Sequence, residues 1–466
     1  MAREITAEEK QTAAAMLVKA RAAMQTVADY DQDQVDRLCR AVAWASGNET
    51  AAVRLANMSV DESGMGSREP TRRAKILGIL RDALRQKSIG IIEEIPEKGI
   101  VKYAKPAGVI ASLIPVTSAY VTPASVAIYA LKCKDAVIFS PHPASRKTTF
   151  EVVRMMRAAL TKLGAPADLL QCLEKPSIPL AQEIMAICDL TNATGGQAMV
   201  RAAYSSGKPA YGVGAGNATM LIDETADIEE AARNTRISKT NDYGSGCSSD
   251  GNLLVEAAIY DAFLAQLQQE GGYVVSKPEK QLLRTAYWDA EGHRTPDTIA
   301  RPAGVVALKA GFALPEGKTF LIVPEDKIGK EHLFSTEKLG IVISIFRYSG
   351  FDNGLDMVRR IFETGGKGHS CGIYSFNDDH IHRLALMAPV SRIMVRQPQS
   401  RANAGHFTNG MPMTSSMGCG IWGGNITNEN IHLKHYMNVT WVSKPLPEDR
   451  PSDAELFGEF YNSEIF

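Results

Sequence analysis

The residue best suited to chemistry is Cys247, which lies in NDYGSGCSSDGNLLVE (residues 241–256), among glycines and serines and just before an apolar, strand-like run. A cysteine that only packs is normally surrounded by bulky apolar side chains, whereas small neighbours let a substrate approach the sulfur. The stretch therefore predicts an accessible, nucleophilic thiol, with an unreactive buried cysteine as the alternative. Four other cysteines stand in apolar helix-like or strand-like stretches, where we expect core positions: Cys133, Cys172, Cys188 and Cys371.

The composition narrows the partners of such a thiol. The chain has 466 residues, of which 45% are hydrophobic, and a formal net charge of -1 without a long basic run. Nucleic acids and anionic membrane surfaces require a concentrated positive field, so we expect small-molecule partners, no nucleic acid and no membrane. The seven cysteines form no CxxC pair. Neither a metal site nor a disulfide framework is therefore indicated, and a reducing cytoplasmic location is expected.

Strands and helices alternate along most of the chain and must position the cysteine loop. The first ninety residues have the apolar spacing of amphipathic helices, and residues 92–106 are expected to form a β-hairpin around a Lys-Gly turn. From about residue 107 the alternation predicts a parallel sheet covered by helices, as in nucleotide-binding domains. A second alternating stretch follows Cys247, and a strand-like run lies near residues 435–442.

Residues 106–131 carry no charge, which raises the question of a membrane span. Pro115 and Pro123 divide this stretch into a strand, a turn and a helix, so we expect a buried strand-loop-helix unit instead. The N-terminus is charged and helical from about residue 6, and no export signal is expected.

Two glycine-rich stretches are candidates for cofactor binding. GVGAGN (212–217) is followed by ATMLID, which is typical of another strand, whereas a phosphate-binding glycine loop should open a helix. We therefore expect a glycine turn there. NATGG (192–196) follows a strand and opens a helix, so it is expected either to face a cofactor or to form a plain turn.

Several stretches together resemble the CoA-acylating aldehyde dehydrogenases. They follow the family's order over nearly the whole chain: TGG at 194–196, AAYSSGKPAYGVGAGN at 202–217, the cysteine loop at 244–250, EKLGIV at 337–342, GGKGHS at 365–370 and GCGIWGGNITNENIHLKHYMNV at 418–439. The resemblance implies an α/β protein with the aldehyde dehydrogenase fold, in which a hairpin and a C-terminal strand pair subunits into a homodimer or homotetramer. The implied parts are a Rossmann-type nucleotide-binding domain at 1–240 with the hairpin at 92–106, an α/β catalytic domain at 241–425, and an oligomerisation strand and tail at 426–466.

The implied reaction begins when the Cys247 thiolate attacks an aldehyde, and the resulting thiohemiacetal loses hydride to NAD or NADP to leave a thioester. Hydrolytic relatives activate water with a glutamate in an ELGG-like turn, and the matching turn here, Gly212–Asn217, has no carboxylate. A thiol attacks a thioester better than unactivated water does, so coenzyme A is expected as the acyl acceptor. The alternatives are a hydrolytic dehydrogenase and an inactive assembly or regulatory homologue.

The resemblance also assigns roles to single residues. Ser118 stands where the family usually has an asparagine that donates to the oxyanion, and a poorer donor there predicts slower turnover. His369 in GKGHS is the third expected catalytic residue, with a structural histidine in a turn as the alternative. Glu337 is expected to hold the nicotinamide ribose, with a solvated pair with Lys338 as the alternative. The full expected cofactor-binding set is Pro141, His142, Thr194, Gly195, Gly196, Gly214 and Glu337.

The expected substrate is a short anionic aldehyde. ALKCKDAVIFSPHP (130–143) and QPQSRANAGHFTNGMPMTSSMGCGIWGGN (397–425) are most similar to the branch that converts sulfoacetaldehyde to sulfoacetyl-CoA with NADP. An anionic substrate needs cationic donors to offset its desolvation, and Arg396 and Arg401 are the expected substrate-binding residues, with plain surface charges as the alternative. Acetaldehyde, propionaldehyde and succinate semialdehyde are the alternative substrates.

Overall fold

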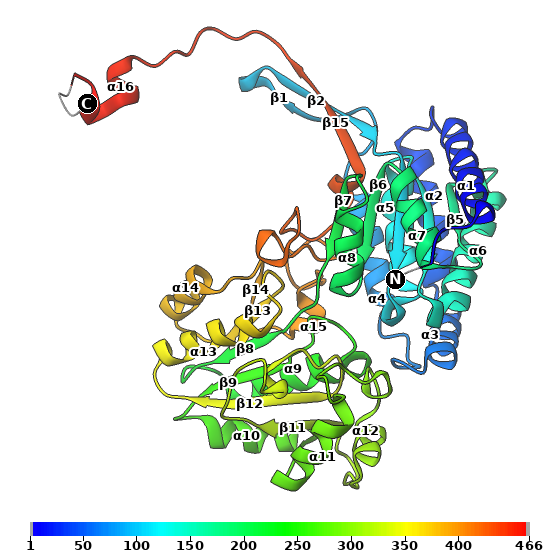
Figure 1. Ribbon diagram of the computed structural model, residues 1–466. Helices are drawn as coiled ribbons and strands as arrows, with labels where there is room; N and C mark the ends of the chain where they lie inside the picture. Colours follow the sequence, from blue (N-terminus) through cyan, green and yellow to red (C-terminus); the bar gives the residue numbers. More distant parts are fainter. Residues whose placement is uncertain (1–2, 463–466) are drawn as a thin grey trace.

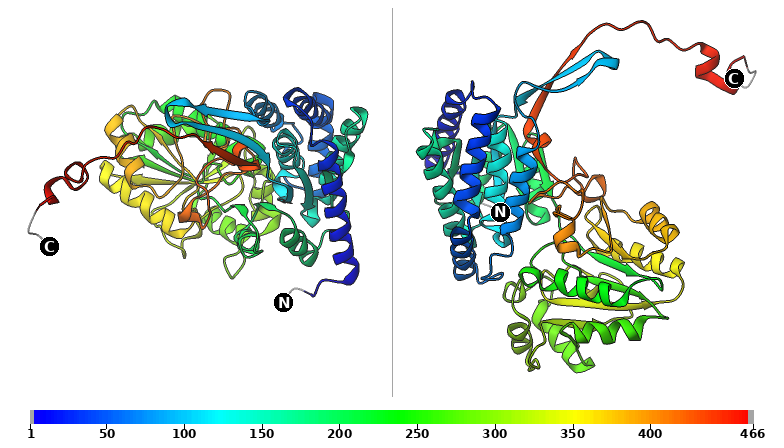
Figure 2. Two further views of the ribbon diagram at one scale, coloured as in Figure 1. Left: turned by 90° about the horizontal axis from the view of Figure 1, so that it is seen from above. Right: turned by 180° about the vertical axis from the view of Figure 1, so that it is seen from behind.

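Residues 3–462, which the computed structural model describes, form three sheets and the helices that cover them (Figure 1). Two of the sheets are parallel, and each is the centre of its own α/β body, whereas the third is a small antiparallel sheet. The two bodies are distinct in every view (Figures 1 and 2). The α/β class expected from the alternating sequence is confirmed.

The first body is built on a five-stranded parallel sheet with the order β5-β4-β3-β6-β7. Its strands are β3 (Val109–Ile114), β4 (Ala136–Pro141), β5 (Leu170–Cys172), β6 (Leu190–Thr194) and β7 (Ala210–Val213). Its helices are α1 (Ala7–Thr26), α2 (Gln32–Gly47), α3 (Glu49–Ser63), α4 (Arg73–Leu84), α5 (Val121–Lys132), α6 (Arg146–Lys162), α7 (Ile178–Ile187) and α8 (Gln197–Tyr204). From β3 the chain adds β4 and β5 on one side of the sheet, and it then adds β6 and β7 on the other side of β3. The loops at the carboxyl ends of β3 and β6 therefore diverge, and parallel sheets usually bind ligands at such a point.

The uncharged stretch at 106–131 is the centre of this body. It forms β3, a 3-10 turn at Val116–Ser118 and α5, and every residue of β3 and α5 is buried. The expected strand-loop-helix unit is confirmed, because Pro115 ends the strand and the helix packs on its sheet. No helix among residues 3–462 is both long and apolar enough to cross a bilayer.

The second body is built on a seven-stranded parallel sheet with the order β10-β11-β12-β9-β8-β13-β14. Its strands are β8 (Thr219–Ile222), β9 (Asn252–Glu256), β10 (Gly272–Val274), β11 (Phe320–Pro324), β12 (Val342–Tyr348), β13 (Cys371–Tyr374) and β14 (Ile393–Val395). Its helices are α9 (Ile228–Thr240), α10 (Tyr260–Gln269), α11 (Lys277–Tyr287), α12 (Ala303–Ala310), α13 (Phe351–Thr364), α14 (Asp378–Met387) and α15 (Gln399–Ala402). Two apolar clusters fill the two faces of the sheet, as a parallel sheet requires.

The sheet pairing divides the chain earlier than the expected boundary at residue 240. β8 lies within the range 1–240, yet it pairs with β9 and β13 in the second sheet. The chain therefore passes from one body to the other in the loop 214–218, directly between β7 and β8.

The antiparallel sheet consists of β1 (Ile91–Ile95), β2 (Ile100–Pro106) and β15 (Met437–Ser443), with β2 in the middle. A 3-10 turn at Pro96–Lys98 and Gly99, whose φ is 61°, connect β1 and β2. The expected hairpin and the expected C-terminal strand are therefore both present. The sheet projects from the first body, and the chain then runs outward to α16 (Asp453–Phe457), as Figures 1 and 2 show.

The loop 214–218 joins opposite edges of the two parallel sheets. It leaves the carboxyl end of β7 and enters the amino end of β8. Strands in each sheet are parallel, so all carboxyl ends of the first sheet share one edge and all amino ends of the second share another. Loops from these two edges meet at the junction of the bodies, and the expected catalytic and cofactor-binding residues lie in these loops or at the strand ends beside them.

Candidate active site

The cysteine loop lies at the amino edge of the seven-stranded sheet. Cys247 precedes β9, Glu337 precedes β12, and His369 precedes β13. β9 is a neighbour of β12, and β8 lies between β9 and β13, so these loops are held close together. The sequence separates these residues widely, and the parallel pairing of their strands brings them to one place.

The sulfur of Cys247 lies against the imidazole of His369. His369 Nε2 is 3.0 Å from Cys247 Sγ, and Nδ1 is 2.9 Å from Ser370 Oγ. His369 is fully buried, whereas Cys247 is partly exposed. The buried guanidinium of Arg392 donates from Nη1 to the His369 carbonyl at 3.1 Å. The structure thus places His369, an expected catalytic residue, next to the expected nucleophile, and its catalytic role stays a prediction.

Burial keeps both groups uncharged at neutral pH. It raises the pKa of the Cys247 thiol to about 12, with Glu337 and Cys419 adding to the rise. Burial also lowers the pKa of His369 to about 3, and the positive charge of Arg392 lowers it further. The thiolate is the reactive form of cysteine. The free protein therefore holds Cys247 as an uncharged, weakly nucleophilic thiol beside a neutral imidazole.

The reactivity of this thiol should depend steeply on pH. Below its pKa, the thiolate fraction of Cys247 grows about tenfold per pH unit, and His369 stays neutral throughout. We therefore expect iodoacetamide to label Cys247 roughly a hundredfold faster at pH 9 than at pH 7 in the protein alone. Mass mapping of the labelled peptide measures this rate. A plateau near pH 8 would show that the free protein already stabilises the thiolate.

Two glycines allow the loops around the thiol to approach each other. A Cβ at Gly216 would lie 2.0 Å from the Cys247 carbonyl oxygen, and one at Gly368, whose φ is 83°, would lie 1.7 Å from the Cys419 carbonyl oxygen. Neither position can carry a side chain without moving backbone. The turn at 212–217 therefore packs directly on the cysteine loop, and it leads from one strand to another as expected.

Glu337 is bound by that same turn. Its Oε1 accepts the Gly216 N–H at 2.9 Å. Burial raises the pKa of Glu337 to about 7. The Gly216 amide and three nearby cations lower this pKa but do not cancel the rise: Arg294, Lys338 and Lys239. Lys338 is itself buried and donates to Asn252 at 3.0 Å, so the pair is not the solvated one considered as an alternative.

The remaining expected catalytic and cofactor residues lie at the carboxyl edge of the five-stranded sheet. Ser118 follows β3, Pro141 ends β4, and His142 follows it. Thr194 ends β6, Gly195 and Gly196 connect β6 to α8, and Gly214 follows β7. This is the edge with the crevice between β3 and β6, so the set is collected opposite the cysteine loop.

This edge fits a dinucleotide. Gly196 is the N-cap of α8 and provides no side-chain cap, so the first N–H groups of the helix can face phosphate oxygens. The residues that would hold the cofactor are the expected set at the ends of β4, β6 and β7, together with Glu337. A bound nicotinamide would supply the hydride acceptor.

Arg396 and Arg401 lie away from the described contacts of the thiol. Arg396, after β14, stacks its guanidinium 3.9 Å from the ring centroid of Phe376, and Arg401 is exposed on α15. Among residues 3–462, neither side chain forms a hydrogen bond or ion pair with the cysteine loop. Their role in substrate binding stays a prediction.

Two arginines at the site had no role in the sequence analysis. Arg392 donates to the His369 carbonyl. It belongs to SRIMVRQP, a stretch in which the sequence points only to Arg396 as a substrate-binding residue. Arg72 precedes α4, and it donates to Ser118 at 3.0 Å and to Ser245 at 2.5 Å. Nothing in the amphipathic pattern of residues 71–86 distinguishes Arg72 from the surface arginines that follow it.

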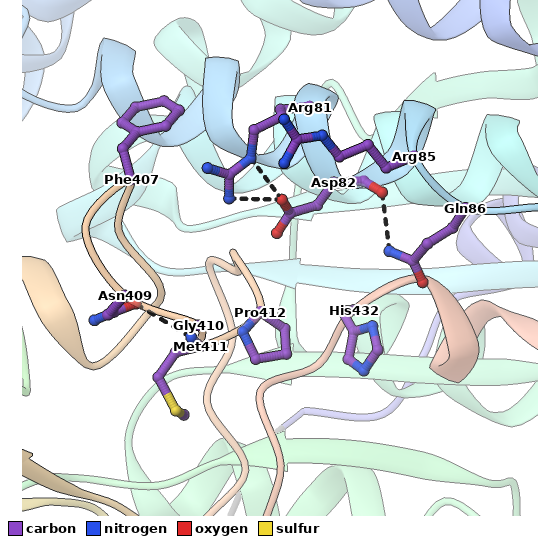
Figure 3. A pocket seen from close by; sticks show the side chains of 10 residues that line it. All are labelled: Arg81, Asp82, Arg85, Gln86, Phe407, Asn409, Gly410, Met411, Pro412 and His432. Carbon is purple, nitrogen blue, oxygen red and sulfur yellow. Dashed lines mark hydrogen bonds and ion pairs between the residues drawn. The ribbon is translucent and has the colours of Figure 1, made fainter.

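A cavity of about 530 Å³ lies between the C-terminal part of α4 and the loop 407–412 (Figure 3). Arg81 and Arg85 extend from the helix side, and Arg81 pairs with Asp82 and lies 5.0 Å from the Phe407 ring centroid. None of its lining residues belongs to the loops around Cys247.

The two-sheet architecture, with a cysteine loop facing a nucleotide-type edge, is that of the aldehyde dehydrogenase class. Comparison with known proteins agrees: the aldehyde dehydrogenase family model matches residues 2–281. The chain belongs to the aldehyde dehydrogenase family.

Individual relatives extend over nearly the whole chain. A sulfoacetaldehyde dehydrogenase of Acholeplasma sp is 44% identical over 449 residues, which cover 95% of this chain and 93% of that protein. An acylating sulfoacetaldehyde dehydrogenase of Bilophila wadsworthia is 41% identical and covers 95% of this chain and 97% of its own length. The crystal structure of an acetylating aldehyde dehydrogenase from Geobacillus thermoglucosidasius superposes with a TM-score of 0.91 at 32% identity, covering 96% of this chain and 99% of that one.

Proposed function

We propose that the protein oxidises a short anionic aldehyde, sulfoacetaldehyde, to its acyl-CoA with NADP. The observation that carries the acylating step is that the turn at 212–217 carries no carboxylate. This turn packs on the cysteine loop, since a Cβ at Gly216 would lie 2.0 Å from the Cys247 carbonyl oxygen, yet none of its side chains can activate water. A thioester on Cys247 is therefore expected to react with a better nucleophile than water, the thiol of coenzyme A.

The residues divide the work as follows. The Cys247 thiolate attacks the aldehyde carbon, and the oxyanion that develops is stabilised by donors at the carboxyl edge, Ser118 among them. His369 Nε2 lies 3.0 Å from the sulfur. It can therefore accept the thiol proton as Cys247 attacks a bound substrate. A bound nicotinamide would supply the acceptor for the hydride that leaves the thiohemiacetal carbon, and the product left on Cys247 would be a thioester. The CoA thiolate attacks this thioester, and the Cys247 thiolate leaves.

Similarity to named relatives supports the substrate and the cofactors. The names of the Acholeplasma sp and Bilophila wadsworthia proteins state sulfoacetaldehyde as their substrate, and the second states acylation. NAD is the alternative to NADP. Acetaldehyde, propionaldehyde and succinate semialdehyde are the alternative substrates.

We also propose a cytoplasmic homodimer or homotetramer. β15 is almost wholly exposed, and Trp441 and Val442 are apolar side chains on it that face solvent in the single chain. A projecting three-stranded sheet with apolar surface is stabilised by pairing with another subunit. Seven cysteines without a disulfide suit a reducing compartment.

The decisive experiment is a panel of four aldehydes, assayed with CoA and with NAD or NADP. We expect sulfoacetaldehyde or succinate semialdehyde to exceed acetaldehyde and propionaldehyde in kcat/KM by about tenfold or more, the scale of one charge-assisted hydrogen bond. Equal or better use of acetaldehyde would reject the anionic substrate and leave a general short-chain acylating enzyme. Turnover with none of the four would favour an inactive homologue.

A further inference from the structure

We propose that Arg72 is the residue that binds the acid group of the substrate, and this proposal rests on the proposed function. Arg72 lies just before α4 and far in sequence from Cys247, yet its guanidinium joins the two sides of the site. It donates from Nη1 to Ser118 Oγ at 3.0 Å and from Nη2 to Ser245 Oγ at 2.5 Å. Ser118 is the expected oxyanion donor, and Ser245 stands two residues before Cys247.

The size of the substrate determines where its acid group must be bound. In sulfoacetaldehyde the sulfonate is carried by the carbon next to the carbonyl, so its oxygens remain close to the reacting carbon. A cation that binds them must therefore adjoin both the oxyanion donor and the cysteine loop. Arg72 contacts both.

Three other arginines, Arg392, Arg396 and Arg401, do not meet this requirement. Arg392 is buried and directs Nη1 and Nη2 to the carbonyl oxygens of His369, Gly418 and Asn428. It therefore lies behind His369 and faces backbone. Arg396 stacks on Phe376, and Arg401 is exposed on α15.

The guanidinium of Arg72 is preorganised by an ion pair. Nη2 also bonds Asp242, whose side chain is only 9% exposed, and the Arg72 side chain is 19% exposed. Asp242 in turn accepts from the Ser67 N–H and from Ser245 Oγ, each at 2.6 Å. The carboxylate thus fixes the planar head in one orientation, and binding then loses little side-chain freedom.

The guanidinium keeps donor capacity for a ligand. It has five N–H donors and no acceptor, and its contacts within residues 3–462 are the bonds to Ser118, Ser245 and Asp242. An acid oxygen beside Ser118 can be met by the remaining N–H groups. A neutral aldehyde lacks this charge-assisted bond, so Arg72 confers selectivity.

The ion pair also holds the loop that precedes the thiol. Asp242, Tyr243 and Gly244 have φ values of 49°, 51° and 69°, and two successive non-glycine residues in this region are strained. Removing Arg72 alone would leave the Asp242 carboxylate buried without its cation. A substitution of both residues is therefore needed beside the single one.

The test compares Arg72→Gln and the double variant Arg72→Gln/Asp242→Asn with the unaltered protein on the same four aldehydes, with CoA present. We expect the ratio of kcat/KM for sulfoacetaldehyde to kcat/KM for acetaldehyde to fall about 10- to 100-fold in both variants, because any disturbance of the cysteine loop lowers both values whereas loss of the charge-assisted bond lowers only the first. Arg85→Gln makes the same charge change in the cavity of Figure 3 and should leave the preference intact.

An equal loss on all four aldehydes would overturn the proposal, because it would mean that Arg72 only positions Ser118 and the cysteine loop. An unchanged preference in both variants would also overturn it. Sulfoacetate protection of Cys247 from iodoacetamide tests the same site without turnover, with protection expected in the unaltered protein and lost in both variants. If sulfoacetate protects Cys247 but the unaltered protein oxidises no aldehyde, the proposed function is refuted and the anion site is upheld. Equal protection in the unaltered protein and both variants would refute the role of Arg72 as the residue that binds the acid group.

Discussion

Replacing Cys247 with alanine should lower both aldehyde oxidation and the reverse reduction of acyl-CoA by more than about a thousandfold, the scale on which removal of a nucleophile acts. No other thiol can take over the attack. Cys419 is buried at 1% exposure with its sulfur directed to the Met417 carbonyl. The loss should fall on kcat, because the substituted site still binds the substrate.

The fold should survive this substitution. The cysteine loop is composed of small residues, and a Cβ at the neighbouring Gly246 would meet nothing closer than 3.9 Å. Circular dichroism and thermal unfolding should match those of the unaltered protein. Cys172→Ala is the matched control, since Cys172 lies on β5 in the first body, and it should keep full activity. Residual activity above a few per cent in the purified Cys247→Ala protein would disprove the assignment of the nucleophile.

The sequence predicted the layers of the fold well because each parallel strand has a local signal. The prolines of the uncharged residues 106–131 favour a buried strand-loop-helix unit over a membrane span, and the structure divides the stretch in that way. The boundary between the bodies had no such signal. ATMLID was recognised as a strand, but its partners β9 and β13 are distant in sequence, and pairing alone decides which sheet it joins.

Candidate site residues could be predicted from the sequence where they belong to a recognisable motif. They could not be predicted where their place in the site depends on a contact between distant parts of the chain. Cys247 and His369 stand in recognisable stretches, and the structure brings them to 3.0 Å. Arg72 and Asp242 are 170 positions apart, and a lone arginine before an amphipathic helix is normally a surface charge. Only the folded arrangement shows that this arginine is partly buried beside Ser118.

Omitting CoA should stop the reaction after a single turnover. With aldehyde and oxidised nicotinamide alone, we expect at most about one hydride per subunit, after which the thioester on Cys247 persists. The physical reason is the absence of a carboxylate in the turn at 212–217, where Gly216 already touches the cysteine backbone. Stopped-flow absorbance of the reduced nicotinamide measures the burst, and intact-protein mass detects the acyl group. Adding CoA should restore steady turnover at once.

Glu337 is the residue that could make this prediction fail. Its pKa is raised to about 7, so its carboxylate form increases as the pH rises through neutrality, and its charge acts on the Cys247 thiol. However, one carboxyl oxygen accepts the Gly216 N–H at 2.9 Å, and this fixed orientation agrees with the ribose-binding role predicted for Glu337. If it did activate water, free acid would form steadily without CoA, faster at pH 8 than at pH 6, and Glu337→Gln would abolish that hydrolysis. A stalled acyl-enzyme at both pH values, discharged only by CoA, is the result expected if the thiol acceptor replaces a water-activating base.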